Sequence, residues 1–360
     1  MTDQEAAWPL EPKPAKAAAT VPAEEIGVWA RLQDAVVKYG FVAVTVVLFI
    51  FFAATEPAFA TSSSIFAMLK FASVTAILGL GMTFAMVVGG MDMSIGSQAG
   101  LAVQMAAMTM VFYNLTGGAA VGVVLVAGLL VGLVNAVLIV LCKVPDLLAT
   151  LAMMFVIQGV KLIPVNGQSV SSGMVLSDGS VAPGKFTADF LLIDRGTVGP
   201  IPLPVIIMLV LAVASWFFLS RTKWGRLMYA VGANPEAARL AGVRVGFYRG
   251  FAYMVSSLFA AVGGLILVSR IGQGDVGAGA SSLLEAVAVA LVGTSVLGAG
   301  KPNAWGTLLG ALLVGIVLTG LTMMGAQYYY QDTAKGLVLL VALLFSYTMS
   351  RKKVRYTPAT

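Results

Sequence analysis

The chain has 360 residues, of which 59% are hydrophobic and only 11% are charged, and its mean hydropathy is +0.94. This composition excludes a soluble domain of that size and indicates an integral membrane protein. The formal charge of +6 comes from basic residues scattered over many segments, which excludes the basic stripe of a nucleic-acid-binding protein. With no His and only one Cys, Cys142, we expect no disulfide framework, no metal site, no cofactor and no catalytic residues.

Residues 1–35 are predicted to form a cytoplasmic tail. Residues 1–23 are rich in Ala, Pro, Lys and Glu, a composition typical of disorder. Apolar residues then recur at helical spacing, which favours either a helix lying on the membrane surface or an extension of the first span. These residues are Ile26, Trp29, Leu32 and Val36.

Residues 36–350 form the predicted transmembrane domain, because a membrane helix needs about 20 apolar residues and many such stretches follow one another here. The fold class is therefore an all-α integral membrane protein with about ten transmembrane helices. We place them near residues 36–54, 65–89, 94–113, 119–141, 146–163, 201–220, 247–268, 283–299, 304–324 and 334–350.

Basic residues set the orientation of these spans. With the N-terminus inside, 16 of the 22 Lys and Arg residues fall on the inner side and 6 on the outer side. Both termini are therefore predicted to be cytoplasmic, with 351–360 as a basic tail and 221–249 as an inward loop. The outward segment 164–200 is then a periplasmic loop, either a surface for an extracytoplasmic partner or a disordered connector. Its alternating stretches Ser169–Val175 and Phe190–Ile193 are typical of a small hairpin.

The inward loop 221–249 contains a short helix with its own start and stop signals. Asn234 is a good N-cap, Pro235 suits the first helical position, and Glu236 places negative charge at the positive end of the helix dipole. Gly242 supplies the left-handed residue that ends a helix. The other residues leave a small-sided surface with one apolar knob on which a partner protein could dock: Ala237, Ala238, Arg239, Leu240 and Ala241. The same features fit an ordinary basic loop of a membrane protein.

Two acidic residues lie within or at the ends of apolar spans, where charge is costly and marks a functional candidate. Asp92 follows two glycines that we expect to break the second span at its inner end, so that Asp92 N-caps the next helix. The alternative is a direct part in substrate passage or gating. Glu285 is expected to begin a span near the outer surface, where it pairs with Arg270, meets water or lines a pathway. The candidate pathway or gate residues are Asp92, Ser94, Gly96 and Glu285.

Glycine spacing supports tight packing of the spans. Residues four apart predict close helix contacts at Gly118/Gly122, Gly128/Gly132 and Gly306/Gly310. An offset of 210 residues also aligns four small residues at two predicted inward junctions, around Gly90 and Gly300, which suggests an internal duplication of the kind common in transporters.

Three stretches of the sequence resemble one family. Gly81-Met82-Thr83-Phe84, followed by Gly89-Gly90-Met91-Asp92-Met93-Ser94-Ile95-Gly96-Ser97, is similar to the pattern G-M-T-x-V…G-G-I-D-L-S-V-G-S. Asn234 to Val243 resembles a cytoplasmic coupling loop, and Gly293 to Ala311 resembles a late G-G-T-S…G-T-L-x-G-A region. Together they look like the membrane permease subunits of ABC importers for monosaccharides, of the ribose, xylose, arabinose and galactose type. The likeness covers roughly residues 40–350. Met93, Ile95 and Val292 depart from the pattern, which leaves the particular sugar open.

This resemblance implies a subunit of the bacterial inner membrane that forms the translocation pathway for a monosaccharide or related polyol. The implied partners are a cytoplasmic ABC ATPase bound to the 234–242 helix, a periplasmic sugar-binding protein, and a second permease subunit, identical or different. The sequence contains no G-x-x-x-x-G-K-[ST] motif, so we expect nucleotide to bind a partner. A neutral substrate agrees with spans that carry polar rather than charged residues, such as Gln98, Gln104, Asn135 and Gln158.

Other functions stay open at this point. A permease for branched-chain amino acids would share the coupling stretch, although a zwitterion favours paired charges or free helix ends in the pathway. An ion-driven secondary transporter would need intramembrane carboxylates, for which Asp92 and Glu285 are thin support, and would leave the 234–242 helix without a task. The lack of His and of a nucleophile–base pair argues against a membrane-embedded hydrolase.

Overall fold

The computed structural model describes residues 28–176, 178–296, 300–327, 329–331, 333–338, 340 and 341. Most of them are helical, as predicted. The helices are α1 (Val28–Thr55), α2 (Ser62–Val87), α3 (Ile95–Val111), α4 (Gly117–Ala136), α5 (Asp146–Leu162), α6 (Ala188–Arg195), α7 (Leu203–Arg221), α8 (Lys223–Ala233), α9 (Pro235–Leu240), α10 (Val245–Ile271), α11 (Ser282–Ser295) and α12 (Ala304–Met323). Shorter elements are the π-helical turn η1 (Val137–Leu141), the 3-10 turn η2 (Ile163–Val165), β1 (Thr197–Val198) and β2 (Ile201–Pro202). The described residues between 329 and 341 are helical as well.

Six of the described helical stretches are long and apolar enough to cross a membrane. They are Ser62–Val87, Gly117–Leu141, Asp146–Val165, Leu203–Arg221, Val245–Ile271 and Ala304–Met323, and shorter apolar helices cover Tyr39–Thr55 and Ser282–Thr294. The predicted tail 351–360 and most of the predicted span 334–350 lie outside the described residues. Of the predicted tail 1–35, residues 28–35 belong to α1 and continue directly into the first span.

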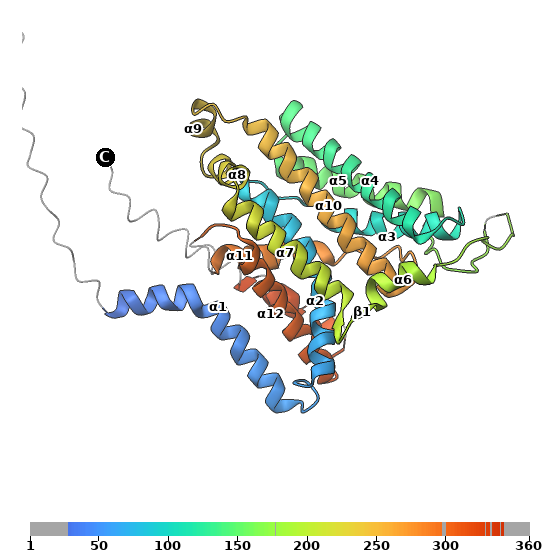
Figure 1. Ribbon diagram of the computed structural model, residues 1–360, viewed down its shortest axis with the longest axis horizontal. Helices are drawn as coiled ribbons and strands as arrows, with labels where there is room; N and C mark the ends of the chain where they lie inside the picture. Colours follow the sequence, from blue (N-terminus) through green and yellow to red (C-terminus); the bar gives the residue numbers. More distant parts are fainter. Residues whose placement is uncertain are drawn as a thin grey trace, which may run out of the picture.

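The helices α2 and α10 occupy the centre of the bundle. α10 packs against α2, α3 and α4, and α2 also packs against α7, α11 and α12. Every side chain of α2 from Ala72 to Ala85 is buried, as expected of a core helix that is apolar all round. Figure 1 shows α8 and α9 at one end of α10, and α6 and β1 at the other. We call these the α9 end and the α6 end of the bundle.

The segment 164–200 lies partly in regular structure at the α6 end. β1 and β2 pair as a small antiparallel hairpin, with Thr197 opposite Pro202 and Val198 opposite Ile201. The prediction of a strand at Phe190–Ile193 is wrong, because these residues belong to α6, where Phe190 and Asp194 are buried on one face at helical spacing. Ser169–Val175 contributes isolated bridges, from Val170 to Gly274 and from Val175 to Val181.

Two of the predicted spans, 94–113 and 283–299, are helices shorter than a full membrane span. α3 has 17 residues and α11 has 14, which correspond to roughly 25 and 21 Å and fall short of the ~30 Å bilayer core. α11 begins beside the middle of α2, where the Thr75 hydroxyl donates to the Glu285 carboxylate at 2.7 Å. α3 begins where Ile95 packs on Gly81 of α2. Both starts agree with the predicted ones to within one residue, at 95 against 94 for α3 and at 282 against 283 for α11.

Close approach between helices is visible at two of the three predicted glycine pairs. Gly128 and Gly132 of α4 lie against α10, and a Cβ added at Gly132 would lie 2.8 Å from the Met254 Cα. Gly306 and Gly310 of α12 lie equally close to α11. A Cβ added at Gly118 or Gly122 meets no atom within 4 Å in the described part of the chain, so that pair makes no close helix contact there.

These contacts predict opposite results for one substitution at two positions of α4. Gly132→Val should lower the melting temperature of the detergent-solubilised protein, because the new side chain must displace α10, at a typical cost of about 1–3 kcal/mol. Gly122→Val is the matched control and should melt like the wild type. Equal melting temperatures for the two variants would contradict the α4–α10 packing described here.

Candidate functional site

The carboxylate of Asp92 lies in the interior of the bundle and only accepts hydrogen bonds. Oδ1 accepts from the Ser94 amide at 3.0 Å and from the Ser94 hydroxyl at 2.5 Å. Oδ2 accepts from the Ser256 hydroxyl at 2.8 Å and from Gln98 Nε2 at 3.4 Å. Asp92 is 0% exposed, so these donors take the place of water around the buried group. Asp92 thus ties the end of the break 88–94 to both α3 and α10.

Asp92 is not the N-cap of the next helix, and that prediction was wrong. α3 begins at Ile95, and its N-cap is Ser94, whose side chain makes no capping bond. Asp92 lies two residues before this N-cap, and its bond to the Ser94 amide closes an Asx-turn instead. Gly89, with φ of 84°, supplies the left-handed residue that ends α2 as predicted. The carboxylate therefore stabilises the break and not the helix dipole.

Neutral polar side chains surround this carboxylate. The Ser94 hydroxyl accepts from Gln98 Nε2 at 2.7 Å and from Asn135 Nδ2 at 3.1 Å, which joins α4 to the cluster. Four buried oxygens near the start of α3 or on the facing helices have no hydrogen-bond partner in the described part of the chain: Ser97 Oγ, Gln98 Oε1, Asn135 Oδ1 and Ser257 Oγ. The interior at this level therefore offers spare hydrogen-bonding capacity without an unbalanced basic group, which suits a neutral hydroxylated ligand.

Gly96 lies where the two short helices α3 and α11 meet. A Cβ added there would lie 2.7 Å from the Gly279 carbonyl oxygen and 3.0 Å from the Leu283 amide nitrogen. The start of α3 therefore touches the start of α11, and any side chain at Gly96 would separate them. From this contact α3 runs towards the α6 end and α11 towards the α9 end.

Glu285 lies on the first turn of α11 and therefore begins that helix, as predicted. It is 8% exposed and pairs with Lys335 at 2.9 Å, and it also accepts from Thr75. The predicted pairing with Arg270 is wrong, because Arg270 contacts Asp194 at 3.0 Å. Glu285 shares no contact with Asp92, so the structure brings together Asp92 and Ser94, with Gly96 on the next turn, and leaves Glu285 apart.

Sequence analysis missed Lys161, which binds the middle of the segment 272–281. Its ammonium group donates to the carbonyls of Val276 at 2.9 Å and Ala278 at 3.3 Å, and the side chain is 6% exposed. Gly274 exchanges backbone hydrogen bonds with Val170 in the same region. A lysine at the end of a predicted span was assigned to the outer loop by charge counting, which cannot show that the chain folds back over it.

At the α9 end, the predicted short helix is present with the predicted caps. Asn234 Oδ1 accepts from the Ala237 amide at 3.0 Å, Pro235 is the first helical residue, and Gly242 adopts a φ of 80°. Glu236 and Arg239 pair at 2.8 Å on the exposed side. Leu240 is 90% exposed, so an apolar side chain stands free beside this ion pair. A capped, rigid helix with an exposed knob is suited to docking.

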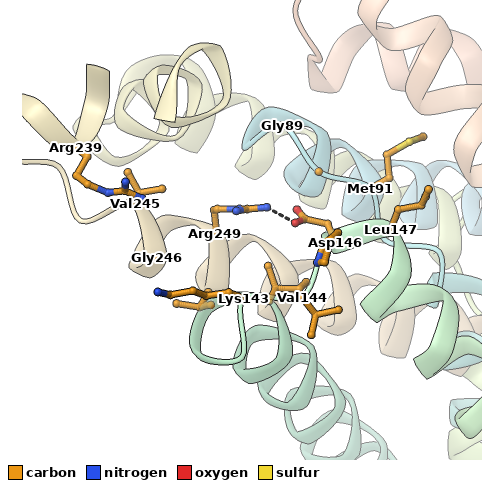
Figure 2. A pocket seen from close by; sticks show the side chains of 14 residues that line it. Gly89, Met91, Lys143, Val144, Asp146, Leu147, Arg239, Val245, Gly246 and Arg249 are labelled. Atoms are coloured by element: carbon orange, nitrogen blue, oxygen red, sulfur yellow. Dashed lines mark hydrogen bonds and ion pairs between the residues drawn. The ribbon is translucent and has the colours of Figure 1, made fainter. Parts of the chain in front are cut away.

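A cavity of about 660 Å³ lies between α9 and the break 88–94. Figure 2 shows Arg249 and Asp146 facing each other across it, with Lys143 and Arg239 on its rim. Asp146 begins α5 and is almost buried, and it accepts from Arg249 and from the Tyr253 hydroxyl at 2.6 Å. Sequence analysis overlooked Asp146 as an acidic residue at a span end. Only the fold brings its partners, about a hundred positions away, to its side.

The structure is thus a bundle of membrane-length helices with a buried polar interior and a short, capped helix exposed at one end. The model of the family described as "Branched-chain amino acid transport system / permease component" matches residues 64–344, and the chain belongs to this family. As a permease component it is a transport subunit of the inner membrane and not an enzyme. A permease of this kind works with an ATPase and a substrate-binding protein.

Curated relatives match the chain over most of its length. The ribose import permease protein of Haemophilus influenzae is 35% identical over 300 residues, which cover 83% of this chain and 90% of the relative. The protein of the same name from Escherichia coli K12 is 34% identical, over 80% of this chain and 87% of its own. The xylose transport system permease protein of Haemophilus influenzae is 27% identical, over 87% and 96%. No solved structure matches the chain.

The contacts of Asp92 predict how it responds to substitution. Asp92→Asn should retain most function, because the remaining oxygen can accept from Ser94, while the Ser256 hydroxyl and the free Gln98 Oε1 can accept from the new amide. Asp92→Leu leaves the Ser94 amide, the Ser94 hydroxyl and the Ser256 hydroxyl without their acceptor, at about 1–3 kcal/mol each, and should not yield folded protein. Expression, melting temperature and uptake are the measurements. An inactive Asn variant that folds normally would show that the negative charge itself is required.

Proposed function

We propose that this chain forms the membrane pathway of an ABC importer for a neutral monosaccharide or related polyol. The observation that carries the proposal is the similarity, over more than four fifths of the chain, to a ribose import permease at 35% identity. The neutral hydrogen-bonding cluster around Asp92 supports it, because hydroxyl and amide groups bind sugar hydroxyls without the cost of moving a charge.

Branched-chain amino acids are the alternative cargo, because the matching family is described by them. A zwitterion needs an available positive charge for its carboxylate. The basic side chains of the described helical core are already engaged: Arg249 on Asp146, Lys70 and Arg270 on Asp194, Lys161 on carbonyls and Lys335 on Glu285. This distribution of charge favours the sugar.

The proposal includes an orientation and an assembly. The basic loop 221–249 supports a cytoplasmic α9 end and a periplasmic segment 164–200, with about ten transmembrane helices and both termini cytoplasmic. A cytoplasmic ABC ATPase docks on α9 through Leu240 and the Glu236–Arg239 pair. A periplasmic sugar-binding protein delivers the substrate at the α6 end. A second permease subunit, identical or different, completes the pathway.

Reconstitution tests the function and its source of energy. In proteoliposomes, the permease with its cognate ATPase, binding protein and ATP should accumulate labelled ribose or xylose, while leucine should not compete. The permease alone should accumulate neither sugar under any imposed proton or sodium gradient. Concentrative uptake by the permease alone would identify an ion-coupled carrier, and leucine uptake by the complete system would identify an amino acid permease.

The docking role of α9 is tested at Leu240. Leu240→Glu should leave the melting temperature unchanged, because the side chain is 90% exposed, but should reduce co-purification of the ATPase and ATP-driven uptake by about tenfold or more, as expected for a lost apolar anchor. The control is Leu192→Glu, at a 56% exposed leucine of α6, which should keep the ATPase bound. Normal ATPase retention by Leu240→Glu would exclude α9 as the docking helix.

A further inference from the structure

The helix α8 joins the docking helix to the interior of the bundle through a single shared residue. Asn234 closes α8, because its amide donates to the Ala230 carbonyl at 3.1 Å, and it opens α9, because its side chain accepts from Ala237 at 3.0 Å. α8 and α9 therefore have no flexible linker between them. A displacement of α9 is passed to α8 at this joint.

One face of α8 touches the first chain break. Gly232 packs directly on the end of α2, where an added Cβ would overlap the Val87 carbonyl oxygen and lie 3.1 Å from the Gly89 amide nitrogen. Gly89 lies in the break 88–94. In the same break, Asp92 is bonded to the start of α3 through Ser94 and Gln98. The contact is backbone on backbone, so it leaves no side chain to absorb a shift.

The same face of α8 contacts the segment that follows α11. The Tyr229 hydroxyl donates to the Pro302 carbonyl at 2.6 Å. Burial raises the pKa of Tyr229 to about 12, so the hydroxyl keeps its proton at neutral pH and remains a donor. The next residue, Asn303, N-caps α12 by accepting from Gly306 at 2.7 Å. Its amide also donates to the carbonyls of Gly293 at 2.6 Å and Val296 at 2.9 Å, at the end of α11.

Residues 229 and 232 are three apart, so one turn of α8 contacts both regions. The first region leads into α3 and the second follows α11, and the starts of these two helices meet at Gly96, Gly279 and Leu283. We propose that α8 is the element that transmits movement of the docking helix to α3 and α11 together, with Tyr229 and Gly232 as its positioning residues. This inference rests on the proposed function, because it assigns the path by which ATPase closure reaches the sugar pathway.

Tyr229→Phe tests the inference, because it removes the hydroxyl and retains the ring. In the reconstituted complete importer, the variant should bind the ATPase and hydrolyse ATP at the wild-type rate. Sugar moved per ATP hydrolysed should fall about threefold to tenfold, as expected for the loss of one buried hydrogen bond.

Gly232→Ala, which forces the α8 backbone away from Val87, should lower the same ratio. The matched control is Tyr248→Phe, a buried tyrosine of the same apolar cluster, which should leave the ratio unchanged.

A wild-type ratio in both Tyr229→Phe and Gly232→Ala would overturn the inference. So would a proportional fall of ATP hydrolysis and uptake together with a lower melting temperature, because that result describes a packing role only. Sugar uptake by the wild-type complex distinguishes failure of this inference from failure of the proposed function. If the wild-type complex shows no ATP-driven sugar uptake, the function itself is wrong, whatever the variants do.

Discussion

Backbone hydrogen bonding inside the membrane is the constraint on which this structure depends. Water is absent from the bilayer core, so each N–H and C=O that leaves a helix there needs a partner within the protein. The chain leaves helical structure at 88–94 and 272–281, and polar side chains bond the backbone of each break. Asp92 within the first break and Thr150 of α5 accept from its amides, while Lys161 of α5 donates to carbonyls of the second and Ser169 accepts from the Val276 amide. The costly buried charges of Asp92 and Lys161 are thereby explained.

The remaining charges follow a related rule. They lie at or near helix ends and are compensated by partners on different helices, as in Asp146 with Arg249, and Asp194 with Lys70 and Arg270. The last group joins α2, α6 and α10 at the α6 end, and the first joins α5 to α10 at the α9 end. Apart from Asp92, whose carboxylate accepts from Ser94 and Ser256, the polar side chains around the start of α3 are neutral, with free oxygens on Gln98 and Asn135. These groups can provide hydrogen bonds to a neutral solute.

The short helices α3 and α11 also provide a point at which the bundle can change shape. Both are shorter than a full membrane span, and their starts contact each other through Gly96, Gly279 and Leu283. Small residues make this contact close without interlocking side chains, so the two starts can separate without loss of side-chain packing. At the opposite end of α11, α8 contacts Pro302 and continues into α9.

The local sequence determined those features that depend on neighbouring residues. Composition specified a membrane protein, and Asn234, Pro235 and Gly242 specified the short helix α9 with its caps, because capping involves only residues within one or two turns. Glycine spacing correctly located two of three close helix contacts. The tertiary structure alone decided the role of Asp92, the partners of Glu285 and Arg270, and the contacts of Lys161. Each of these depends on residues separated by tens to hundreds of positions, which no local sequence pattern can bring together.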